Sequence, residues 1–381
     1  MRRSTIRELL KLTARPDMIS FAGGLPAPEL FPLEQMRRAT ECVLTQRGHA
    51  ALQYGETEGV AELRDWLAAR FSTKGIAVER ANVLITTGAQ QALDLIGRIF
   101  LDEGDAVIVE NPTYLALLSA WRPWGVRFLP VISDASGMCV NELDPLFAQR
   151  PKLVYSVPNF QNPQGTTLGL EGRLRLLKLL RENDAVVVED DPYGELRYEG
   201  EFLPHLFELD RGEGRVLHVG TFSKTIAPGL RVGWVIAPEE VIEKLVLAKQ
   251  GADLHTSTFC QHVLYEMVRE GLLEKRLPLL REAYQERRDA MLSALEEWFP
   301  GDASWTRPEG GMFLMVNFPA NVDTAELLKV ALQLKVAFVP GEEFHAAEGG
   351  RNTLRLNFSN SPPAVIEQGI QRLKTAVDEL S

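Results

Sequence analysis

The sequence predicts an α/β fold with a mainly parallel central sheet and a second, smaller α+β domain. Between about residues 80 and 240, short apolar runs alternate with amphipathic helical stretches, a pattern typical of strands buried between layers of helices. After residue 280 the pattern changes to a long charged helix followed by strand-like segments. A chain of 381 residues is long enough for two or three domains with a cleft between them.

The N-terminal region is expected to be an arm, residues 1–45, that packs with the small domain. It holds a predicted helix over residues 5–12 and a Gly- and Pro-rich segment, residues 20–32, which cannot form regular structure. The large domain is expected to span residues 46–280 and the small C-terminal domain residues 281–381.

Apolar runs and helical periodicity predict the remaining elements. The strands of the large domain are predicted at residues 83–87, 106–109, 153–157, 185–189, 216–220 and 232–237, with a helix at 90–100. The small domain is predicted to contain a helix at 281–299, strands at 310–318, 336–340 and 353–358, and a closing helix at 363–380.

Composition excludes several classes of function. The chain carries 41 basic and 52 acidic side chains, a formal net charge of −11, which argues against nucleic acid as a partner. Its three cysteines lie far apart without a CxxC pair, and its histidines form no HExxH or His-x-His pattern, so we expect neither disulfides nor a metal site. No signal peptide or run of about 18 apolar residues is evident, which predicts a cytoplasmic protein that does not bind membranes.

Four polar segments each follow a predicted strand, at the edge where open α/β sheets bind ligands. The first, residues 86–95, places Gly88, Ala89 and Gln90 at the start of a helix. Backbone N–H groups and the helix dipole attract phosphate there. The alternative is that Thr87 and Gly88 only cap the helix.

The second and third segments supply an amide and a carboxylate. In residues 157–165, prolines on both sides hold Asn162 in an extended or turn conformation, and the simpler alternative is a turn without a ligand. Asp190 and Tyr193 follow a wholly apolar strand, where a carboxylate is costly to bury unless a cation meets it. A salt bridge or helix cap at Asp190 or Asp191 is the alternative.

The fourth segment, residues 218–234, combines Thr221, Ser223, Lys224 and Arg231 between two apolar strands. Two hydroxyls with an arginine suit a phosphate, and a lysine whose pKa is lowered by burial and a neighbouring cation forms a Schiff base with an aldehyde. Together with an acid for a pyridinium nitrogen and a tyrosine and asparagine for a phenolic oxygen, these groups meet the needs of pyridoxal phosphate.

The ordered set of motifs resembles the pyridoxal-phosphate enzymes of fold type I, in the class I/II aminotransferase family. The resemblance runs through nearly the whole chain and is strongest toward the subgroup of LysN-type 2-aminoadipate aminotransferases and their kynurenine/aminoadipate relatives. The segments that carry it are SFAGGLPAPELFP, LQYGETEG, TTGAQQALDL, NFQNPQG, VVVEDDPY, TFSKTIAPGLRVGW, AKQGADLHT and NTLRLNFS.

The resemblance implies roles around the cofactor ring. Lys224 would bind the cofactor aldehyde as a Schiff base, and Asp190 would pair with the pyridine nitrogen. Tyr193 and Asn162 would hydrogen-bond the ring oxygen, and Tyr114 would stack on the ring face. Lys224, Asp190 and Tyr193 are thus the expected catalytic residues.

The resemblance also implies a phosphate site and a homodimer. The phosphate site would be formed by Gly88, Ala89, Gln90, Thr221, Ser223 and Arg231. Many relatives have serine at the positions of Thr221 and Ala89, so the hydroxyl is kept at the first position only, and a backbone contact would serve at the second. Tyr54 matches a tyrosine that reaches the phosphate of the partner subunit, which implies a homodimer with shared active sites.

Substrate contacts follow in the same way. Arg355 matches the family arginine that binds the α-carboxylate, Asn162 would assist it, and Gly23 and Gly24 would let the backbone approach the pocket. Arg7 lies in the predicted N-terminal helix that in close relatives covers the site and recognises a side-chain carboxylate. A solvated surface arginine is the alternative for Arg7.

These expectations define a ping-pong transamination with 2-oxoglutarate as acceptor. The leading donor is 2-aminoadipate, as a step towards lysine, with broader use of leucine and aromatic amino acids. An aromatic, kynurenine or branched-chain aminotransferase is the alternative, and a β-lyase or decarboxylase with the same cofactor also remains. An effector-binding module of a regulator is disfavoured because no winged-helix segment precedes the arm, and an inactive homologue because the cofactor motifs are present.

Overall fold

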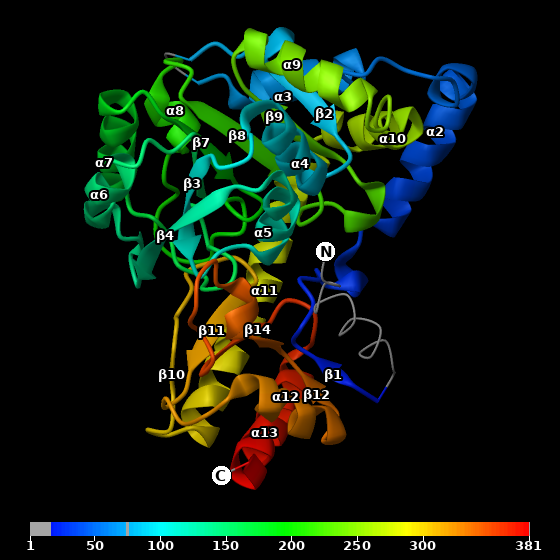
Figure 1. Ribbon diagram of the computed structural model, residues 1–381. Coiled ribbons are helices and arrows are strands. Elements are labelled where there is room, and N and C mark those ends of the chain that lie inside the picture. Colours follow the sequence, from blue (N-terminus) through cyan, green and yellow to red (C-terminus); the bar gives the residue numbers. More distant parts are fainter. Residues whose placement is uncertain (1–16, 74–75, 381) are drawn as a thin grey trace.

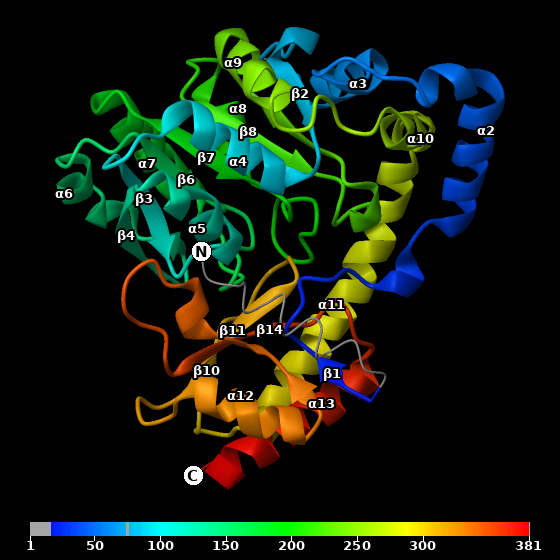
Figure 2. The same cartoon turned by 45° about the vertical axis from the view of Figure 1, so that its right-hand side comes forward.

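The computed structural model describes residues 17–73 and 76–380. A large and a small domain are joined by the 27-residue helix α11 (Leu272–Trp298), which runs from one into the other (Figures 1 and 2). This helix begins nine residues before the expected helix at 281–299, so the domain boundary that we expected at residue 280 falls inside it. No helix in the described ranges combines the length and apolarity that a membrane crossing needs.

The large domain is built on a mixed sheet that, within the described residues, has eight strands in the order β2-β9-β8-β7-β6-β3-β4-β5. Neighbours from β8 to β4 are parallel, whereas β9 is antiparallel to β2 and β8, and β5 to β4. The strands are β2 (Val83–Thr86), β3 (Ala106–Asn111), β4 (Arg127–Asp134), β5 (Gly137–Met138), β6 (Leu153–Ser156), β7 (Val186–Asp190), β8 (Val216–Thr221) and β9 (Gly233–Ile236). The predicted fold class is confirmed.

Two strands of this sheet, β4 and β5, were not predicted. The other six end within two residues of the predicted bounds. Strand β4 lies near the edge of the sheet and alternates buried with exposed positions, with Pro130 in its middle. The sequence prediction relied on continuous apolar runs, which mark strands buried on both faces and miss a half-exposed one.

Helices cover both faces of the sheet (Figure 1). The helices of the large domain are α2 (Leu33–Ala51), α3 (Ala61–Phe71), α4 (Ala89–Phe100), α5 (Leu115–Trp121), α6 (Asp144–Phe147), α7 (Leu170–Glu182), α8 (Leu206–Asp210), α9 (Glu239–Gln250) and α10 (Thr258–Arg269). Helix α4 is the most clearly amphipathic, and its residues Leu93 and Ile96 are fully buried in the core beside β8 and β9.

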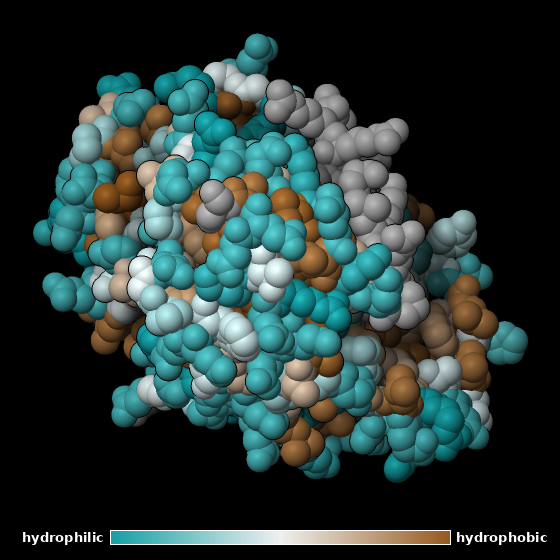
Figure 3. All heavy atoms as spheres, turned by 90° about the horizontal axis from the view of Figure 1, so that it is seen from below, coloured by the Kyte–Doolittle hydropathy of each residue, from teal (hydrophilic) through white to brown (hydrophobic). Residues whose placement is uncertain are grey.

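The small domain has a four-stranded antiparallel sheet, β10-β11-β14-β13, packed with α11, α12 (Thr324–Gln333) and α13 (Pro363–Leu380). Its strands are β10 (Ser304–Trp305), β11 (Phe313–Asn317), β13 (Val339–Pro340) and β14 (Thr353–Asn357). One core cluster, which includes Phe318, Leu356 and Ile370, fills the space between them. Seen from this end, the surface is mostly hydrophilic with scattered apolar groups (Figure 3).

The N-terminal segment is tied to the small domain by a short parallel pair between β1 (Ile19–Ser20) and β12 (Val336–Ala337). The segment at 20–32 is irregular except for Ser20 and a 3-10 turn at Pro28–Leu30, so the expectation of no regular structure was slightly too strict. The helix predicted at residues 5–12 lies outside the described residues.

Strand polarity sets where the functional residues meet. Strands β6, β7 and β8 are parallel neighbours, and β2 runs in the same direction as β8 because two antiparallel pairings separate them. Their carboxyl ends, at Thr86, Ser156, Asp190 and Thr221, therefore lie on one edge of the sheet. All four predicted polar segments begin there.

A buried arginine holds one of these segments in place. Arg173 of α7 is fully buried and donates to the backbone oxygens of Leu168, Pro158 and Pro204 and to Oδ1 of Asn159. Backbone acceptors of the loop that carries Asn162 thus depend on one guanidinium.

We expect Arg173→Leu to lower the free energy of unfolding by about 3 kcal/mol, because several buried acceptors lose their donor. Arg175→Leu on the same helix is the matched control, since the one ion pair of Arg175 among the described residues is with the exposed Asp144, at 3.0 Å, and it should cost less than about 1 kcal/mol. Urea unfolding followed by circular dichroism measures both. Equal losses would contradict this role of Arg173.

Candidate active site

A cavity of about 2520 Å³ lies at the carboxyl edge of the sheet and is lined by both domains. It brings together most of the predicted site residues, from segments far apart in the sequence. These are Gly24, Ala89, Gln90, Tyr114, Asn162, Asp190, Tyr193, Thr221, Ser223, Lys224, Arg231 and Arg355.

Lys224 follows β8 and extends into this cavity. Its Nζ donates a hydrogen bond to the backbone oxygen of Gly24 at 2.7 Å. Burial, with the positive charges of Arg355 and Arg231, lowers the pKa of Lys224 to about 8. The amine is therefore far more nucleophilic near neutral pH than an exposed lysine.

Asp190 ends β7 and is almost fully buried. Its Oδ2 accepts a hydrogen bond from the Tyr155 hydroxyl at 2.7 Å, whereas its buried Oδ1 has no partner among the described residues. Burial raises the pKa of Asp190 to about 7, and the hydrogen bond from Tyr155 partly offsets that rise. Oδ1 is thus an acceptor that awaits a donor, and a cationic N–H would suit it best.

The residues predicted to bind a phosphate lie at the end of β8 and at the start of α4. Gly88 precedes the helix with φ +80°, and a Cβ there would lie 2.5 Å from Nη2 of Arg231. Arg231 itself has φ +54° and lines the cavity. The hydroxyls of Thr221 and Ser223 lie 2.9 Å apart at the same end of β8. Glycine at 88 therefore leaves room for the Arg231 guanidinium beside the start of α4, where helix N–H groups can bind an anion.

Arg355 of β14 reaches the cavity from the small domain. Its Nη1 donates to Asn162 Oδ1 at 2.8 Å and its Nη2 to the Ala22 oxygen at 2.6 Å, while its buried Nε has no partner in the described chain. Its guanidinium carbon lies 4.3 Å from the ring centre of Phe313 and 4.9 Å from that of Phe344. Burial lowers the pKa of Arg355 to about 10, so it remains a cation and suits a carboxylate.

Two tyrosines complete the wall. Tyr193 packs edge-on against Phe313, with ring centres 5.8 Å apart. Tyr114 donates to Gln90 Oε1 at 3.4 Å, and Gln90 in turn donates to the Ala116 oxygen. Burial raises the pKa of Tyr114 to about 12 and raises that of Tyr193 also. Both phenols are neutral donors at physiological pH, and the backbone N–H of Gln90 stays available because only its side chain is engaged.

Three predicted residues do not line this cavity, and a fourth cannot be placed against it. Gly23 precedes Gly24, which lines the cavity, and Gly88 is next to the guanidinium of Arg231, which also lines it. Tyr54 is 79% exposed on the surface, at edge-on contact with His255. Arg7 lies outside the described residues.

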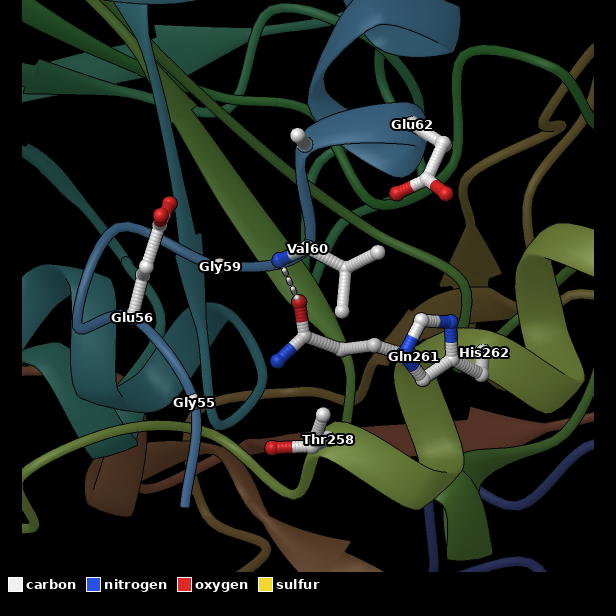
Figure 4. Close-up of a pocket in the computed structure, with 9 residues that line it drawn as sticks. Gly55, Glu56, Gly59, Val60, Glu62, Thr258, Gln261 and His262 are labelled. Carbon is white, nitrogen blue, oxygen red and sulfur yellow. Dashed lines mark hydrogen bonds between the residues drawn. The ribbon is translucent and has the colours of Figure 1, made fainter. Parts of the chain in front are cut away.

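A second hollow, of about 180 Å³, lies beside Tyr54 between the loop at 55–60 and α10 (Figure 4). The carboxylates of Glu56 and Glu62 lie on it, and the backbone N–H of Val60 is already bound to Gln261 Oε1. Two carboxylates repel a phosphate. Carboxylates line the large cavity too, but of the two hollows only the large one is also lined by lysine and arginine side chains, among them Lys224, Arg231 and Arg355, which can bind an anion.

The fold also forms a cluster that no histidine motif indicated. Glu189, His205 and His218 place their ligand atoms within 4.8 Å of one another. Glu189 accepts hydrogen bonds from His218 and from two backbone N–H groups at the start of α8. Burial lowers the pKa of His205, but the hydrogen bond and charge of Asp191 outweigh it and raise the value to about 9. The positive charge of protonated His205 therefore compensates the buried carboxylates of Asp191 and Glu189.

The sequence analysis missed several lining or supporting residues. Tyr155 lies inside an apolar strand, where a buried tyrosine needs a partner for its hydroxyl, and that need was the only available signal. Phe313 and Phe344 face Arg355 from segments predicted only as strand or loop. Residues 342–349, which line the cavity mouth, gave no signal.

Comparison with known proteins accounts for this arrangement. The family model for aminotransferase class I and II matches residues 17–373. The chain belongs to the class I/II aminotransferase family. Because the match spans nearly every described element, it includes the cavity and both domains.

Curated relatives and solved structures agree over the whole chain. A 2-aminoadipate transaminase of Thermus thermophilus is 47% identical over 99% of this chain and 94% of its own length. Aromatic-amino-acid aminotransferase 1 of Thermococcus litoralis is 45% identical, over 100% and 92% respectively. The crystal structure of LysN from Thermus thermophilus, complexed with N-(5'-phosphopyridoxyl)-L-leucine, superposes with a TM-score of 0.94 at 44% identity, covering 100% of this chain and 95% of that one.

Aminotransferases of this family use pyridoxal phosphate, and the cavity fits that group. The orphan Oδ1 of Asp190 suits a protonated ring nitrogen, and the cradle that glycine at 88 leaves beside Arg231 suits the phosphate. Lys224 offers an amine of lowered pKa between them.

We expect the rate at which the apoprotein captures pyridoxal phosphate to rise about tenfold per pH unit below pH 8 and to level off above it. The reason is that the neutral amine of Lys224 accumulates as pH passes its pKa of about 8. Stopped-flow absorbance between pH 6 and 9 measures this rate.

Nα-acetyl-lysine, with an ordinary pKa, is the control and should keep gaining rate throughout that range. Ionisation of Asp190 near pH 7 would also raise the rate of capture as pH rises. The variant Asp190→Asn removes that contribution and leaves the contribution of Lys224. A rate that still rises about tenfold between pH 8 and pH 9 would show that the pKa of Lys224 is not lowered.

Proposed function

We propose that this protein transfers the amino group of an L-amino acid to 2-oxoglutarate, with 2-aminoadipate as its leading donor. The observation that carries the proposal is the pairing, in one cavity, of the low-pKa Lys224 amine with the buried Arg355 guanidinium, whose Nε lacks a partner in the described chain. A proton-transfer group and an α-carboxylate anchor are what a transamination requires.

Each residue has a role in the proposed reaction. Bound pyridoxal phosphate supplies an aldehyde carbon for amine exchange and a ring that accepts the electron pair of the substrate Cα–H bond. The Lys224 amine accepts the proton from the substrate Cα and returns it to the cofactor carbon. Asp190 Oδ1 holds the proton on the ring nitrogen, while Tyr193 and Asn162 donate to the ring oxygen.

Binding groups fix the substrate and the phosphate. Arg355 binds the α-carboxylate, and its contact with Asn162 joins that anchor to the side chain proposed for the ring oxygen. Arg231, Thr221 and Ser223, with the helix N–H groups of Ala89 and Gln90, hold the phosphate. Tyr114 covers the ring face. Reaction at Cα then proceeds between two fixed ends, which lowers the entropic part of the barrier.

The choice of donor rests on the relatives and on the resemblance in sequence. One relative is named for 2-aminoadipate and another for aromatic amino acids, and the LysN complex carries a leucine adduct. We therefore infer broad use that includes leucine and aromatic amino acids. Aromatic, kynurenine or branched-chain amino acids as main donors are the alternative. With 2-aminoadipate as main donor, lysine biosynthesis would be the setting.

We further propose a cytoplasmic homodimer with shared active sites. Tyr54 and Leu52 are 79% and 70% exposed, and Leu33 is 71% exposed on the neighbouring helix α2. Large side chains that are so exposed favour burial against a second copy. In that dimer Tyr54 would reach the partner's phosphate. Free cysteines at all three positions favour a reducing compartment.

The test of the proposed function is a pair of half-reactions followed by visible absorption. The holoprotein should lose its lysine-dependent band on addition of 2-aminoadipate and regain it on addition of 2-oxoglutarate. Lys224→Ala, as the control, should show neither change. A band that ignores every amino acid would contradict aminotransferase activity, and release of ammonia without acceptor would indicate a lyase.

We expect Arg355→Lys to raise KM for amino donors about 100-fold, because a lysine replaces a bidentate fork with a single point charge. The visible band and the affinity for pyridoxal phosphate should stay near the wild-type values, because lysine keeps the positive charge and Arg355 is not proposed to contact the cofactor. Steady-state kinetics with 2-aminoadipate and leucine measures the effect. An unchanged KM would exclude Arg355 as the carboxylate anchor.

Arg7 is proposed to support the preference for an acidic side chain. We expect Arg7→Ala to lower kcat/KM for 2-aminoadipate about tenfold or more relative to leucine, because only the former carries a second carboxylate. The neighbouring Arg3→Ala serves as a charge-matched control and should leave the ratio unchanged. A ratio that Arg7→Ala does not alter would remove this role.

A further inference from the structure

Among the described residues, the hydroxyl of Tyr155 has one hydrogen-bond partner, Asp190. Both side chains are buried, and the oxygen–oxygen distance is 2.7 Å. Burial and the charge of Asp190 raise the pKa of Tyr155 well above its ordinary value of 10. The phenol therefore keeps its proton, and the ionised Asp190 accepts a hydrogen bond from it through Oδ2.

Strand register places the two side chains together. Tyr155 of β6 pairs with Val188 of β7, so Asp190 lies two residues further on the same face of the sheet. Diagonal neighbours of this kind lie within reach of a long aromatic side chain. The contact is thus built into the sheet and does not depend on a loop.

A neighbouring tryptophan fixes the orientation of the phenol ring. The Trp121 ring meets the Tyr155 ring edge-on, with centres 6.0 Å apart. The indole N–H of Trp121 donates in turn to the Leu93 oxygen at 2.8 Å, and all of these side chains are buried. Tyr155 therefore has little freedom to move its hydroxyl away from Asp190.

The carboxylate of Asp190 is held asymmetrically as a result. Oδ2 is occupied by Tyr155, whereas Oδ1 is buried, unpartnered within the described chain, and belongs to a residue that lines the cavity. We propose that Tyr155 is a positioning residue for the reaction, whose hydroxyl fixes Asp190 so that one carboxylate oxygen faces the cofactor ring nitrogen. This inference rests on the proposed pairing of Asp190 with that nitrogen.

The hydrogen bond has an electrostatic effect as well as a geometric one. A carboxylate at this depth is costly to ionise, and the donated hydrogen bond offsets part of that cost. Loss of the hydroxyl would leave a carboxylate that is both freer to rotate and harder to ionise. The N–H of the ring nitrogen would then meet a poorer acceptor.

Tyr155→Phe tests the inference because it removes one oxygen atom and keeps the ring packed on Trp121. We expect the dissociation constant for pyridoxal phosphate, measured by tryptophan fluorescence, to rise about 10- to 100-fold, the usual range for a hydrogen bond to a charged group. The ¹⁵N chemical shift of ring-labelled pyridoxal phosphate in the holoprotein should move toward that of the unprotonated nitrogen.

Tyr284→Phe is the matched control. Tyr284 is also a fully buried tyrosine, and among the described residues its hydroxyl oxygen accepts one hydrogen bond, from the Ala27 N–H, and makes none with Asp190. Its variant should lose a similar amount of stability and leave both the dissociation constant and the ¹⁵N shift unchanged. Thermal unfolding of both variants shows whether each is folded.

A double-mutant cycle with Asp190→Asn separates positioning from general packing. Tyr155→Phe should weaken binding less than about threefold on top of Asp190→Asn, because its effect acts through the carboxylate. An equal loss in both backgrounds, or no loss in either, would overturn the inference. If Asp190→Asn alone bound the cofactor as tightly as wild type with an unchanged ¹⁵N shift, the proposed role of Asp190 itself would fail.

Discussion

Burial of three ionisable side chains around one cavity is the constraint on which the rest of the site depends. Asp190 and Arg355 are buried and Lys224 is partly buried, and none of the three belongs to an ion pair in the described part of the chain. The hydrogen-bond partners that these three side chains have among the described residues are all neutral. Burial shifts the pKa of each in the direction that favours its uncharged form: up for Asp190, and down for Lys224 and Arg355. Such an arrangement is unfavourable in an empty protein. It becomes favourable when a ligand supplies the missing opposite charges.

The two domains share this cost. The large domain provides Lys224 and Asp190 from the ends of adjacent parallel strands, and the small domain provides Arg355 from β14. Two of the contacts that cross between the domains involve these residues: Lys224 Nζ donates to the Gly24 oxygen, and Arg355 donates to Asn162. Any shift of one domain against the other would therefore alter the amine and the carboxylate anchor together, which couples substrate binding to the position of the proton-transfer group.

The site residues that could be predicted from the sequence are those whose function is indicated by their neighbours along the chain. The loop residues of the four polar segments were identifiable because polar groups after apolar strands are unusual, and the resemblance in motifs assigned them. Strand β4 escaped because a half-exposed strand lacks a continuous apolar run. The hydrogen-bond partner of Asp190 was not predicted for another reason. Tyr155 is 35 residues away in the sequence, and the register of β6 against β7 brings the two side chains together. The cluster of Glu189, His205 and His218 was not predicted either, because its members come from different elements.

The central claim is that Lys224 is the residue that binds the cofactor aldehyde. Reduction of the holoprotein with borohydride, followed by peptide mass spectrometry, tests it directly because the reduced adduct is stable. The account predicts one added phosphopyridoxyl group per chain, on the peptide that contains Lys224, and none after prior displacement by an amino donor. An adduct on another lysine such as Lys249, which is also buried, or no adduct at all, would contradict the account.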